Sequence, residues 1–258
     1  MGIKIVLIGA GNLAINLGLA LHEAGHEIVQ VYSRTVRSAK DAAKLFRTVS
    51  TNKLKKLADA DLYIVALKDS VLQDVIPALC EGRKDKLFVH TSGCLPMDIF
   101  KDYAYNYGVL YPLQTFSKEK RVDFSHIPCL VEGCNRWATN LLKALCRSIS
   151  DDVRPITSED RRYIHLAAVF CSNFSNLCYS MANEVLQQRH LRFNMLLPLI
   201  DETAAKVHVL PPRQAQTGPA VRFDENVMDM HLDLLDENTD FQEIYLKMSE
   251  QIQRLLPD

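Results

Sequence analysis

The sequence predicts an α/β protein in which a doubly wound Rossmann domain is followed by an all-α domain. Three observations lead to this prediction. Short apolar runs alternate with helix-periodic stretches along the first part of the chain, a glycine-rich turn joins the first run to the first helix, and strand signals stop after Ile156. We therefore expect a Rossmann domain over residues 1–157 and a helical domain over residues 158–258.

The first apolar run, Ile3–Ile8, has a bias towards β-branched residues, as in a strand buried on both faces. The predicted strands are Ile3–Ile8, His26–Tyr32, Asp61–Leu67, Leu87–His90, Val109–Tyr111, Cys129–Val131 and Val153–Ile156. The stretches with helical spacing are Leu13–Ala24, Ser38–Phe46, Val71–Leu79 and Trp137–Ile149. Such alternation requires crossover connections, so we expect a parallel sheet with helices on both faces.

The second part of the chain contains helical patterns alone. A long amphipathic stretch begins at Ser158 and runs to about residue 190, with acidic residues in its first turn. Further helices are expected at Phe193–Val209, Glu225–Leu235 and Phe241–Leu255, the last of which carries one apolar stripe.

Composition narrows the classes of partner. The chain has 258 residues, 48% hydrophobic and 24% charged, with a formal net charge of −1, which is typical of a globular protein without a basic nucleic-acid footprint. Its seven cysteines form no CxxC pair and no Cys/His set with metal-ligand spacing, so we expect free thiols and no metal site. With neither a signal-peptide pattern nor a membrane-length apolar run, a cytoplasmic location is the expectation.

The glycine turn is Gly9-Ala10-Gly11-Asn12-Leu13-Ala14, a GxGxxA motif that follows a strand and opens a helix. In this context the first glycine permits the sharp turn, the second lets a pyrophosphate approach the backbone, and the alanine allows close helix–strand packing. We expect Gly9, Gly11, Asn12 and Leu13 to bind a dinucleotide at the helix N-terminus. The alternative is a strand-to-helix turn that binds nothing.

The end of the second strand favours NADP over NAD. An NAD-binding domain places an acidic residue there to hold the ribose hydroxyls, but no acidic residue occurs between Glu27 and Asp41. Ser33 and Arg34 follow the strand instead, and a guanidinium can bind a 2′-phosphate with two donors. The alternative is that Arg34 is a surface residue beside a cofactor without that phosphate.

Two other strands end at the same predicted sheet edge. Ala66 and Leu67 end the third strand, and His90 ends the fourth. Because ligands of such sheets bind at the carboxyl ends of the strands, we expect these residues to contact the cofactor. For His90, a structural role in bonding nearby backbone is the alternative.

These motifs and several later ones occur together in a known family. Its further motifs are Ala66-Leu-Lys-Asp69, His90-Thr-Ser-Gly93, Tyr111-Pro-Leu-Gln-Thr-Phe116, His165-Leu-Ala-Ala-Val-Phe-Cys-Ser-Asn173 and Thr217-Gly-Pro219. The chain thereby resembles a bacterial family that pairs a Rossmann-like NADP oxidoreductase domain with a C-terminal helical domain of unknown function. Its first half is similar to pyrroline-5-carboxylate reductases, deazaflavin-dependent NADP reductases and β-hydroxyacid dehydrogenases. The resemblance implies a second domain like that of 6-phosphogluconate dehydrogenase, which binds substrate at an interdomain cleft and forms a homodimer.

The catalytic lysine of the β-hydroxyacid dehydrogenases has no counterpart here, because the matching stretch, Ala167–Leu177, contains no lysine. His165 is the candidate proton donor, since imidazole titrates near neutral pH, and Asn173 and Ser92 are further catalytic candidates. Gln114 and Asn176 are candidate substrate-binding residues. Each of these side chains could instead fill a structural hydrogen-bonding role.

The leading hypothesis is an NADP(H)-dependent oxidoreductase that acts on a small carbonyl, imine or hydroxy-acid metabolite, without nucleic-acid or membrane partners. Two alternatives stay open. The absent lysine is compatible with a non-catalytic NADP-binding or redox-sensing protein, and the resemblance also includes deazaflavin-dependent reduction of NADP.

Overall fold

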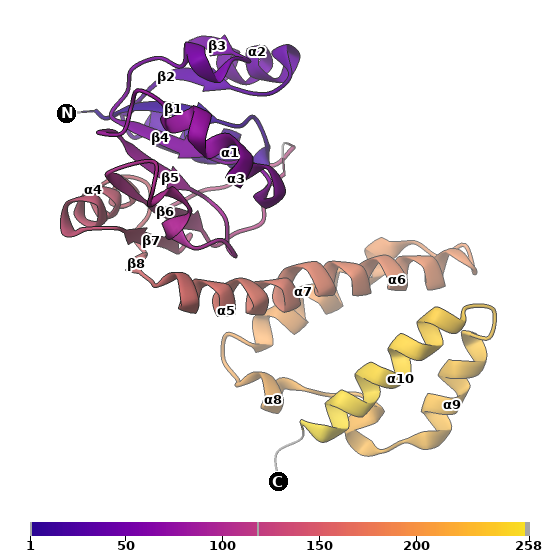
Figure 1. Ribbon diagram of the computed structural model, residues 1–258. Coiled ribbons are helices and arrows are strands. Elements are labelled where there is room, and N and C mark those ends of the chain that lie inside the picture. Colours follow the sequence, from indigo (N-terminus) through magenta and orange to yellow (C-terminus); the bar gives the residue numbers. More distant parts are fainter. Residues whose placement is uncertain (1, 118, 256–258) are drawn as a thin grey trace. The chain divides into compact units, whose positions relative to one another are not determined.

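The computed structural model describes residues 2–117 and 119–255, and these divide into two compact units at Asn173/Phe174 (Figure 1). The first unit is built on an eight-stranded sheet with the order β3-β2-β1-β4-β5-β6-β7-β8. Its strands are β1 (Lys4–Ile8), β2 (Glu27–Tyr32), β3 (Val49–Thr51), β4 (Leu62–Val65), β5 (Leu87–His90), β6 (Asn106–Pro112), β7 (Cys129–Gly133) and β8 (Val153–Pro155). The predicted doubly wound α/β class is confirmed, and β3 is a strand that the sequence did not predict.

The sheet is mixed rather than wholly parallel. Strands β1 to β6 run parallel, but β7 pairs antiparallel with β6, from Gly108↔Gly133 to Pro112↔Cys129. The expectation of a parallel sheet throughout is therefore wrong at β7. No helix lies in the described residues between β6 and β7, and without a crossover helix the chain returns as an antiparallel neighbour.

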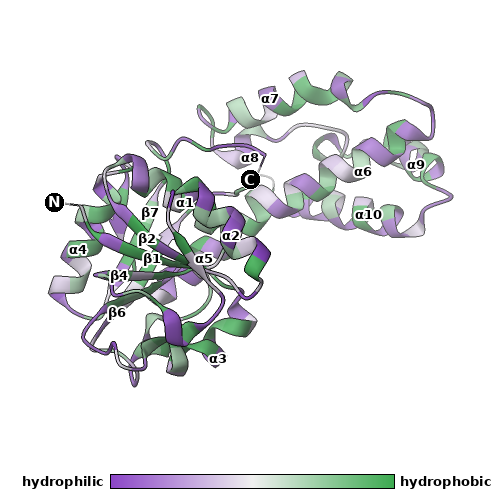
Figure 2. Cartoon of the chain, turned by 90° about the horizontal axis from the view of Figure 1, so that it is seen from above, coloured by the Kyte–Doolittle hydropathy of each residue, from purple (hydrophilic) through white to green (hydrophobic). Residues whose placement is uncertain are grey.

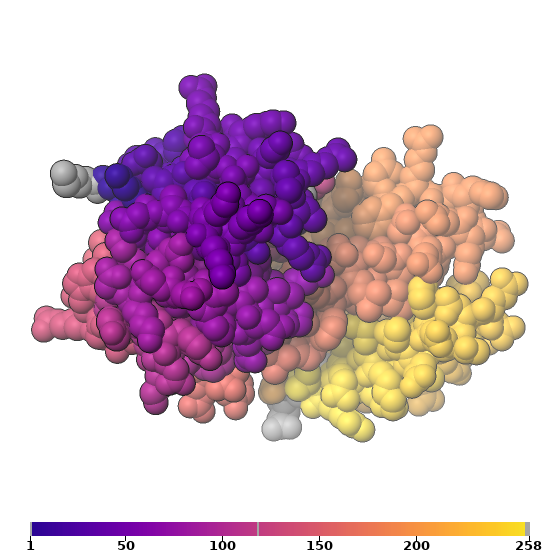
Figure 3. All heavy atoms as spheres, turned by 45° about the horizontal axis from the view of Figure 1, so that its top comes forward, coloured from indigo at the N-terminus to yellow at the C-terminus, as the bar shows by residue number. Residues whose placement is uncertain are grey.

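Helices cover both faces of the sheet. They are α1 (Asn12–Glu23), α2 (Val36–Leu45), α3 (Asp69–Cys80) and α4 (Arg136–Arg147), with short 3-10 turns at Leu54–Lys56 and Met97–Phe100. In β1, Ile5 and Leu7 join the core under α1, α2 and α4, whereas Val6 and Ile8 join the core under α3. Figure 2 shows α1, α2, α3 and α4 around the strands of this sheet, with hydrophobic residues in green. Figure 3 shows the atoms of the first unit, from indigo to pink, in close packing on the face in view.

Both edges of this sheet are very short strands. β3 and β8 each contain three residues, and neither is buried along its length. The six inner strands are longer and contain nearly all of the buried apolar residues of the sheet.

One helical segment leads from the first unit into the second. It consists of α5 (Ser158–Ala168), a π-helix (Val169–Phe174) and α6 (Ser175–Gln187) in direct succession. Strands thus end at Pro155 and helices follow from Ser158, whereas the division into compact units falls at Asn173/Phe174. The predicted domain boundary after residue 157 stays a prediction.

The second unit is all helical, as expected. It continues with a 3-10 turn (Phe193–Leu196), α7 (Leu197–Lys206), α8 (Pro212–Ala215), a second 3-10 turn (Ala220–Arg222), α9 (Glu225–Leu234) and α10 (Thr239–Arg254). Over the described ranges 2–117 and 119–255, every helix is too short or too polar to cross a membrane.

Candidate functional site

The glycine turn has the geometry that a phosphate-binding turn requires. Gly9 has a φ of +132°, and a Cβ there would lie 2.3 Å from the Ala66 carbonyl oxygen. A Cβ on Gly11 would meet nothing within 4 Å, so open space lies above this glycine. Gly11 is the N-cap of α1 and has no capping side chain, and the first helical bond runs from the Ile15 N–H to the Gly11 carbonyl (3.0 Å). The preceding N–H groups, those of Asn12 and Leu13 among them, are thus available to an anion.

The end of β2 presents an unpaired guanidinium. The Gly9 N–H donates to the Tyr32 carbonyl (2.8 Å), which holds the end of β2 beside the glycine turn. Ser33 follows, with its N–H bonded to the Thr51 carbonyl (3.2 Å). The Arg34 side chain is exposed and makes no ion pair or side-chain hydrogen bond with any described residue, whereas Arg37 lies 3.8 Å from Asp41.

Two further strand ends lie along this edge. The Ala66 N–H donates to the Ile8 carbonyl (2.8 Å), so Ala66 and Leu67 follow β4 directly beside the glycine turn. The next strand, β5, ends at His90, and the Thr91 N–H donates to the Val65 carbonyl (3.3 Å). All three strand ends therefore lie at the same edge, as the sequence predicted from their order.

The His90 side chain is fully engaged by the protein. It is 0% exposed, its Nε2 lies 3.2 Å from the Pro96 carbonyl oxygen, and its Nδ1 accepts from the Ser92 N–H (3.1 Å). Burial, and secondarily the nearby Arg161 charge, lower the pKa of His90 to about 3, so the ring is neutral and donates from Nε2. With both nitrogens bonded, this geometry favours the structural alternative over the expected contact with a cofactor.

Ser92 stabilises the loop that follows β5. Its Oγ donates to Asp69 Oδ2 (2.7 Å) and accepts from the N–H groups of Cys94 (3.1 Å) and Leu95 (3.0 Å). The hydroxyl thus ties this loop to the first turn of α3. Ser92 was predicted as a catalytic candidate, but in the structure its hydroxyl is already engaged in these three hydrogen bonds.

Gly93 lies directly under the His165 ring. A Cβ at Gly93 would lie 2.5 Å from His165 Cγ and 2.6 Å from Nδ1, so the ring packs where any other residue would have a side chain. Gly93 joins the loop after β5, and His165 lies on α5, so this contact brings two distant segments of the first unit together.

His165 also contacts Tyr111, which belongs to the Tyr111–Phe116 motif but was not predicted as a site residue. Tyr111 Oη lies 3.0 Å from His165 Nδ1, and the two rings meet edge to face with centroids 6.0 Å apart. Burial raises the pKa of Tyr111, and the neighbouring Cys94 thiol acts in the same direction, so the phenol keeps its proton. A phenol that donates to Nδ1 leaves the imidazole proton on Nε2, at the other end of the ring.

A buried ion pair anchors the first turn of α5 to the sheet. Arg161 is 1% exposed, and its Nη1 donates to Glu132 Oε2 on β7 (2.8 Å), while Nη2 donates to the Leu95 carbonyl. Glu132 also accepts from the N–H (2.8 Å) and the hydroxyl (2.5 Å) of Ser158. The Ser158 hydroxyl in turn accepts from the Met97 N–H (3.1 Å), so one network joins α5, β7 and the loop after β5.

The Arg161–Glu132 ion pair and the Tyr111–His165 pair are separated by similar distances along the sheet and along α5. Glu132 pairs with Val109 across β6 and β7, and Tyr111 lies two residues farther along β6, about 6.6 Å at the usual strand rise. His165 lies four residues after Arg161 on α5, about 6 Å at the usual helix rise. Ile164 packs against Val109 and Tyr111, so α5 lies along this part of the sheet and delivers His165 to Tyr111.

A pocket of about 510 Å³ opens beside this pair, and Gln114, His165 and Asn173 all line it. The structure thus brings together three of the predicted site residues from segments about 50 residues apart in sequence. Asn176 lies on α6 in the second unit, where its carbonyl accepts from the Ser180 hydroxyl (3.1 Å). Its predicted role in substrate binding stays a prediction.

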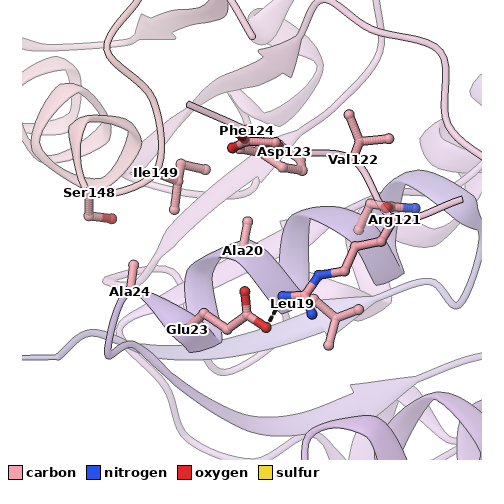
Figure 4. A pocket seen from close by; sticks show the side chains of 11 residues that line it. Leu19, Ala20, Glu23, Ala24, Arg121, Val122, Asp123, Phe124, Ser148 and Ile149 are labelled. Atoms are coloured by element: carbon pink, nitrogen blue, oxygen red, sulfur yellow. Dashed lines mark hydrogen bonds and ion pairs between the residues drawn. The ribbon is translucent and has the colours of Figure 1, made fainter. Parts of the chain in front are cut away.

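The loop that carries Gln114 is fastened to α1. Asn12 Nδ2 donates to the Phe116 carbonyl (2.9 Å), and Asn16 Nδ2 donates to the Ser117 carbonyl (3.1 Å). At the other end of α1, Glu23 pairs with Arg121 beside a second pocket, of about 570 Å³ (Figure 4). The residues that line this second pocket include none of the glycine turn, which lies at the N-terminal end of α1.

Two family models match the chain. Residues 4–92 match the model described as "NADP oxidoreductase coenzyme F420-dependent", which covers the glycine turn and the strand ends up to Ser92. Residues 127–252 match the model described as "Domain of unknown function (DUF2520)", which includes Glu132, Arg161 and His165. A search of curated proteins gave no match to this chain.

Solved structures share the whole architecture. A "putative NADP oxidoreductase" from Bacteroides fragilis is 46% identical, with 98% of each chain covered and a TM-score of 0.95. An imine reductase from Myxococcus stipitatus, solved with NADP⁺, is 13% identical, with 97% of this chain and 93% of that chain covered and a TM-score of 0.70. A 1-pyrroline-5-carboxylate reductase from Streptococcus pyogenes is 14% identical, with 98% and 99% covered and a TM-score of 0.64.

Proposed function

Because this chain belongs to the family that joins an NADP oxidoreductase domain to a C-terminal DUF2520 domain, we propose that it is an NADP(H)-dependent oxidoreductase of a small carbonyl, imine or hydroxy-acid metabolite. One observation carries the proposal beyond the family. Tyr111 Oη lies 3.0 Å from His165 Nδ1 in a pocket lined by a strand-end loop, so a hydrogen-bond donor, the His165 Nε2–H, is held in place where a substrate can enter.

The residues of the first unit fit a dinucleotide. Open space above Gly11 and the uncapped start of α1 suit a pyrophosphate, and the positive φ of Gly9 makes the turn possible. We propose NADP rather than NAD because Arg34 is exposed and unpaired within the described residues, with the Ser33 hydroxyl beside it. Ala66 and Leu67 would complete the binding edge.

In the proposed chemistry the protein supplies a hydrogen bond at the reacting atom. The nicotinamide of the bound cofactor would supply or accept the hydride. The Nε2–H of His165 donates a hydrogen bond to the substrate oxygen or nitrogen and stabilises the negative charge that develops there, while water supplies the proton that the reduced product takes up. Tyr111 keeps Nδ1 hydrogen-bonded so that the ring holds its tautomer and orientation. Gln114 and Asn173, which line the same pocket, orient the substrate through neutral hydrogen bonds.

A second candidate function is hydride exchange between NADP and a deazaflavin. It is favoured by the description of the family model that matches residues 4–92, which names coenzyme F420. A third, a non-catalytic NADP-binding or redox-sensing role, is favoured by the absence of lysine from residues 167–177. The 510 Å³ pocket with a hydrogen-bonded donor supports a small-molecule substrate instead. The imine reductase of the same fold supports the imine class.

We also propose that the second unit pairs with a second copy of the chain. Among its described residues, 174–255, only Ala220 and Ser249 are buried, while many large apolar side chains are exposed. An apolar pocket of about 330 Å³ lies along α6 and α10 and includes Phe241, Ile244 and Met248. A helical unit with so little core of its own gains stability from association.

The cofactor proposal is tested by fluorescence titration of the purified protein with NADPH and, separately, with NADH. We expect tighter binding of NADPH, and a loss of about 10- to 100-fold in Arg34→Ala because a charge-assisted phosphate contact is removed. Arg37→Ala is the matched control, since its guanidinium is already near Asp41. Absence of binding by either dinucleotide would overturn the proposal, and equal affinities would overturn the preference for NADP.

The catalytic proposal is tested by NADPH oxidation with panels of ketones, imines and a deazaflavin. We expect turnover of a carbonyl or imine, lowered about 10²- to 10⁴-fold in His165→Gln and less in Tyr111→Phe, with NADPH affinity retained. Turnover of the deazaflavin alone would establish the second candidate function. NADPH binding without any turnover would favour the sensing role.

The pairing proposal is tested by sedimentation. Wild-type protein should sediment as a dimer, and Met248→Glu should dissociate it because a carboxylate would enter the apolar pocket. Lys247→Glu introduces the same charge on an exposed neighbouring side chain and should leave the dimer intact. A monomeric wild type would refute the proposal.

A further inference from the structure

We propose that the pocket beside Tyr111 and His165 selects an uncharged, mainly apolar substrate and discriminates against substrates that carry a carboxylate or a phosphate. The inference rests on the proposed function, because it names the substrate class of the same site. It would restrict the substrate to neutral carbonyls and imines.

Apolar side chains form much of the pocket wall. Leu113 comes from the loop after β6, and Ile164, Ala167, Ala168 and Val169 come from α5 and the start of the π-helix. These side chains offer contact to an aliphatic or aromatic group but no hydrogen bond. Burial of such a group removes apolar surface from water and therefore favours binding.

Three polar side chains of the wall, those of Gln114, Thr115 and Asn173, are amides or a hydroxyl and carry no charge. They line the same pocket as Tyr111 and His165. The Gln114 side-chain oxygen already accepts from the Thr115 N–H (2.8 Å), which leaves its amide NH₂ to donate. Such groups can orient one C=O or C=N bond, and none of them carries the positive charge that would balance an anion.

No Lys, Arg, Asp or Glu lines this pocket within the described residues. The guanidinium on the same helix, that of Arg161, is 1% exposed and is bonded to Glu132 and to the Leu95 carbonyl. Its charge is thus neutralised inside the protein and is not offered to a ligand. A carboxylate that entered the pocket would lose part of its hydration without gaining a charged partner, which disfavours its binding.

The test uses two unreactive ligands of the same shape, pentanamide and pentanoate, with the full-length protein at about pH 8. Binding is followed by NMR of the Tyr111 and His165 rings, with and without NADPH. We expect pentanamide to bind at least tenfold more tightly than pentanoate. Because neither ligand is reduced, the result does not depend on turnover.

A second part of the test uses a variant that adds a positive charge to the pocket wall. Ala168→Lys places an ammonium at the pocket wall and should shift the affinity ratio at least tenfold toward pentanoate. Leu166→Lys puts the same charge on α5 outside this pocket, beside Arg162 and Tyr163, and should leave the ratio unchanged. Thr115→Lys, at an exposed position of the same wall, serves if Ala168→Lys does not fold.

Pentanoate binding as tight as that of pentanamide would overturn the inference, and so would failure of both ligands to perturb the two rings. These outcomes are separate from those of the proposed function. A protein that binds NADPH and reduces a carboxylate-bearing substrate preferentially keeps the proposed function and loses this inference. One that prefers pentanamide but binds no dinucleotide keeps the pocket selectivity and loses the proposed function.

Discussion

The contact between Gly93 and His165 gives a quantitative prediction for Gly93→Ala. The new Cβ would lie 2.5 Å from His165 Cγ and 2.9 Å from its Cβ, whereas carbon atoms in contact are normally 3.5 Å or more apart. The imidazole must therefore retreat by about 1 Å. The Gly93 backbone itself has no positive φ, so the whole effect comes from the side-chain clash.

The ring cannot retreat without loss, because α5 is anchored by the buried Arg161–Glu132 pair. A shift of about 1 Å lengthens the 3.0 Å bond between Tyr111 Oη and His165 Nδ1 beyond hydrogen-bond range. We expect a stability loss of about 1–3 kcal/mol from overpacking. We also expect a fall of up to about 100-fold in turnover from the misplaced donor, with NADPH affinity unchanged.

The assay combines urea unfolding, NADPH titration and NMR of the His165 ring nitrogens. Gly11→Ala is the matched control, because its Cβ meets nothing within 4 Å. Gly11→Ala should change the free energy of unfolding by less than about 1 kcal/mol, because the loss from a poorer N-cap is offset by the lower entropy of the unfolded chain. It should nevertheless weaken NADPH binding. The reasoning is refuted if Gly93→Ala is as stable as the wild type and its His165 nitrogen resonances do not move.

Two further predictions concern the buried polar groups around this site. Glu132→Ala should lower the free energy of unfolding by about 3–5 kcal/mol, because it leaves the Arg161 charge buried and unpaired. The control in the same urea assay is Glu250→Ala, which breaks the exposed Lys247–Glu250 pair and should stay within about 0.5 kcal/mol of the wild type. Equal losses of stability in the two variants would contradict a stabilising role of the buried Arg161–Glu132 pair. The pKa of His90 is lowered to about 3, chiefly by burial, so between pH 6.5 and 3 the unfolded chain binds a proton that the folded chain does not. Stability should therefore fall as the pH drops through this window, by at most about 1.4 kcal/mol per pH unit, and less steeply in His90→Gln; parallel pH profiles would show that His90 does not titrate this way.

Elements with strong periodicity could be predicted from the sequence, and short or direction-dependent features could not. The strand Leu87–His90 was predicted with the same bounds that the structure has. A run of Leu, Phe, Val and His between two turns leaves few alternatives to a short strand. The strand at Val49–Thr51 was missed, since three residues give no measurable period. The antiparallel direction of β7 was missed because an apolar run has the same pattern in either direction.

The site was only partly predictable for a similar reason. The glycine turn is local, so Gly9 and Gly11 could be assigned from spacing alone. The Tyr111–His165 bond joins residues 54 positions apart, and no sequence pattern indicates which partner a histidine will find. For His90, a strand-end position suggested a ligand contact, and only the folded chain shows that both ring nitrogens are already bonded.

The short strands at the two edges of the sheet have a consequence for how copies of this chain can meet. An exposed strand edge is a template for intermolecular β-pairing and aggregation, and its hazard grows with its length. Here the long apolar strands are all interior, and each rim offers only three residues, one rim ending in Pro155, which has no N–H to donate. These short edge strands therefore disfavour ribbon-like β-pairing between copies of the chain. Ordered self-association would then use side chains on helices instead of strand edges.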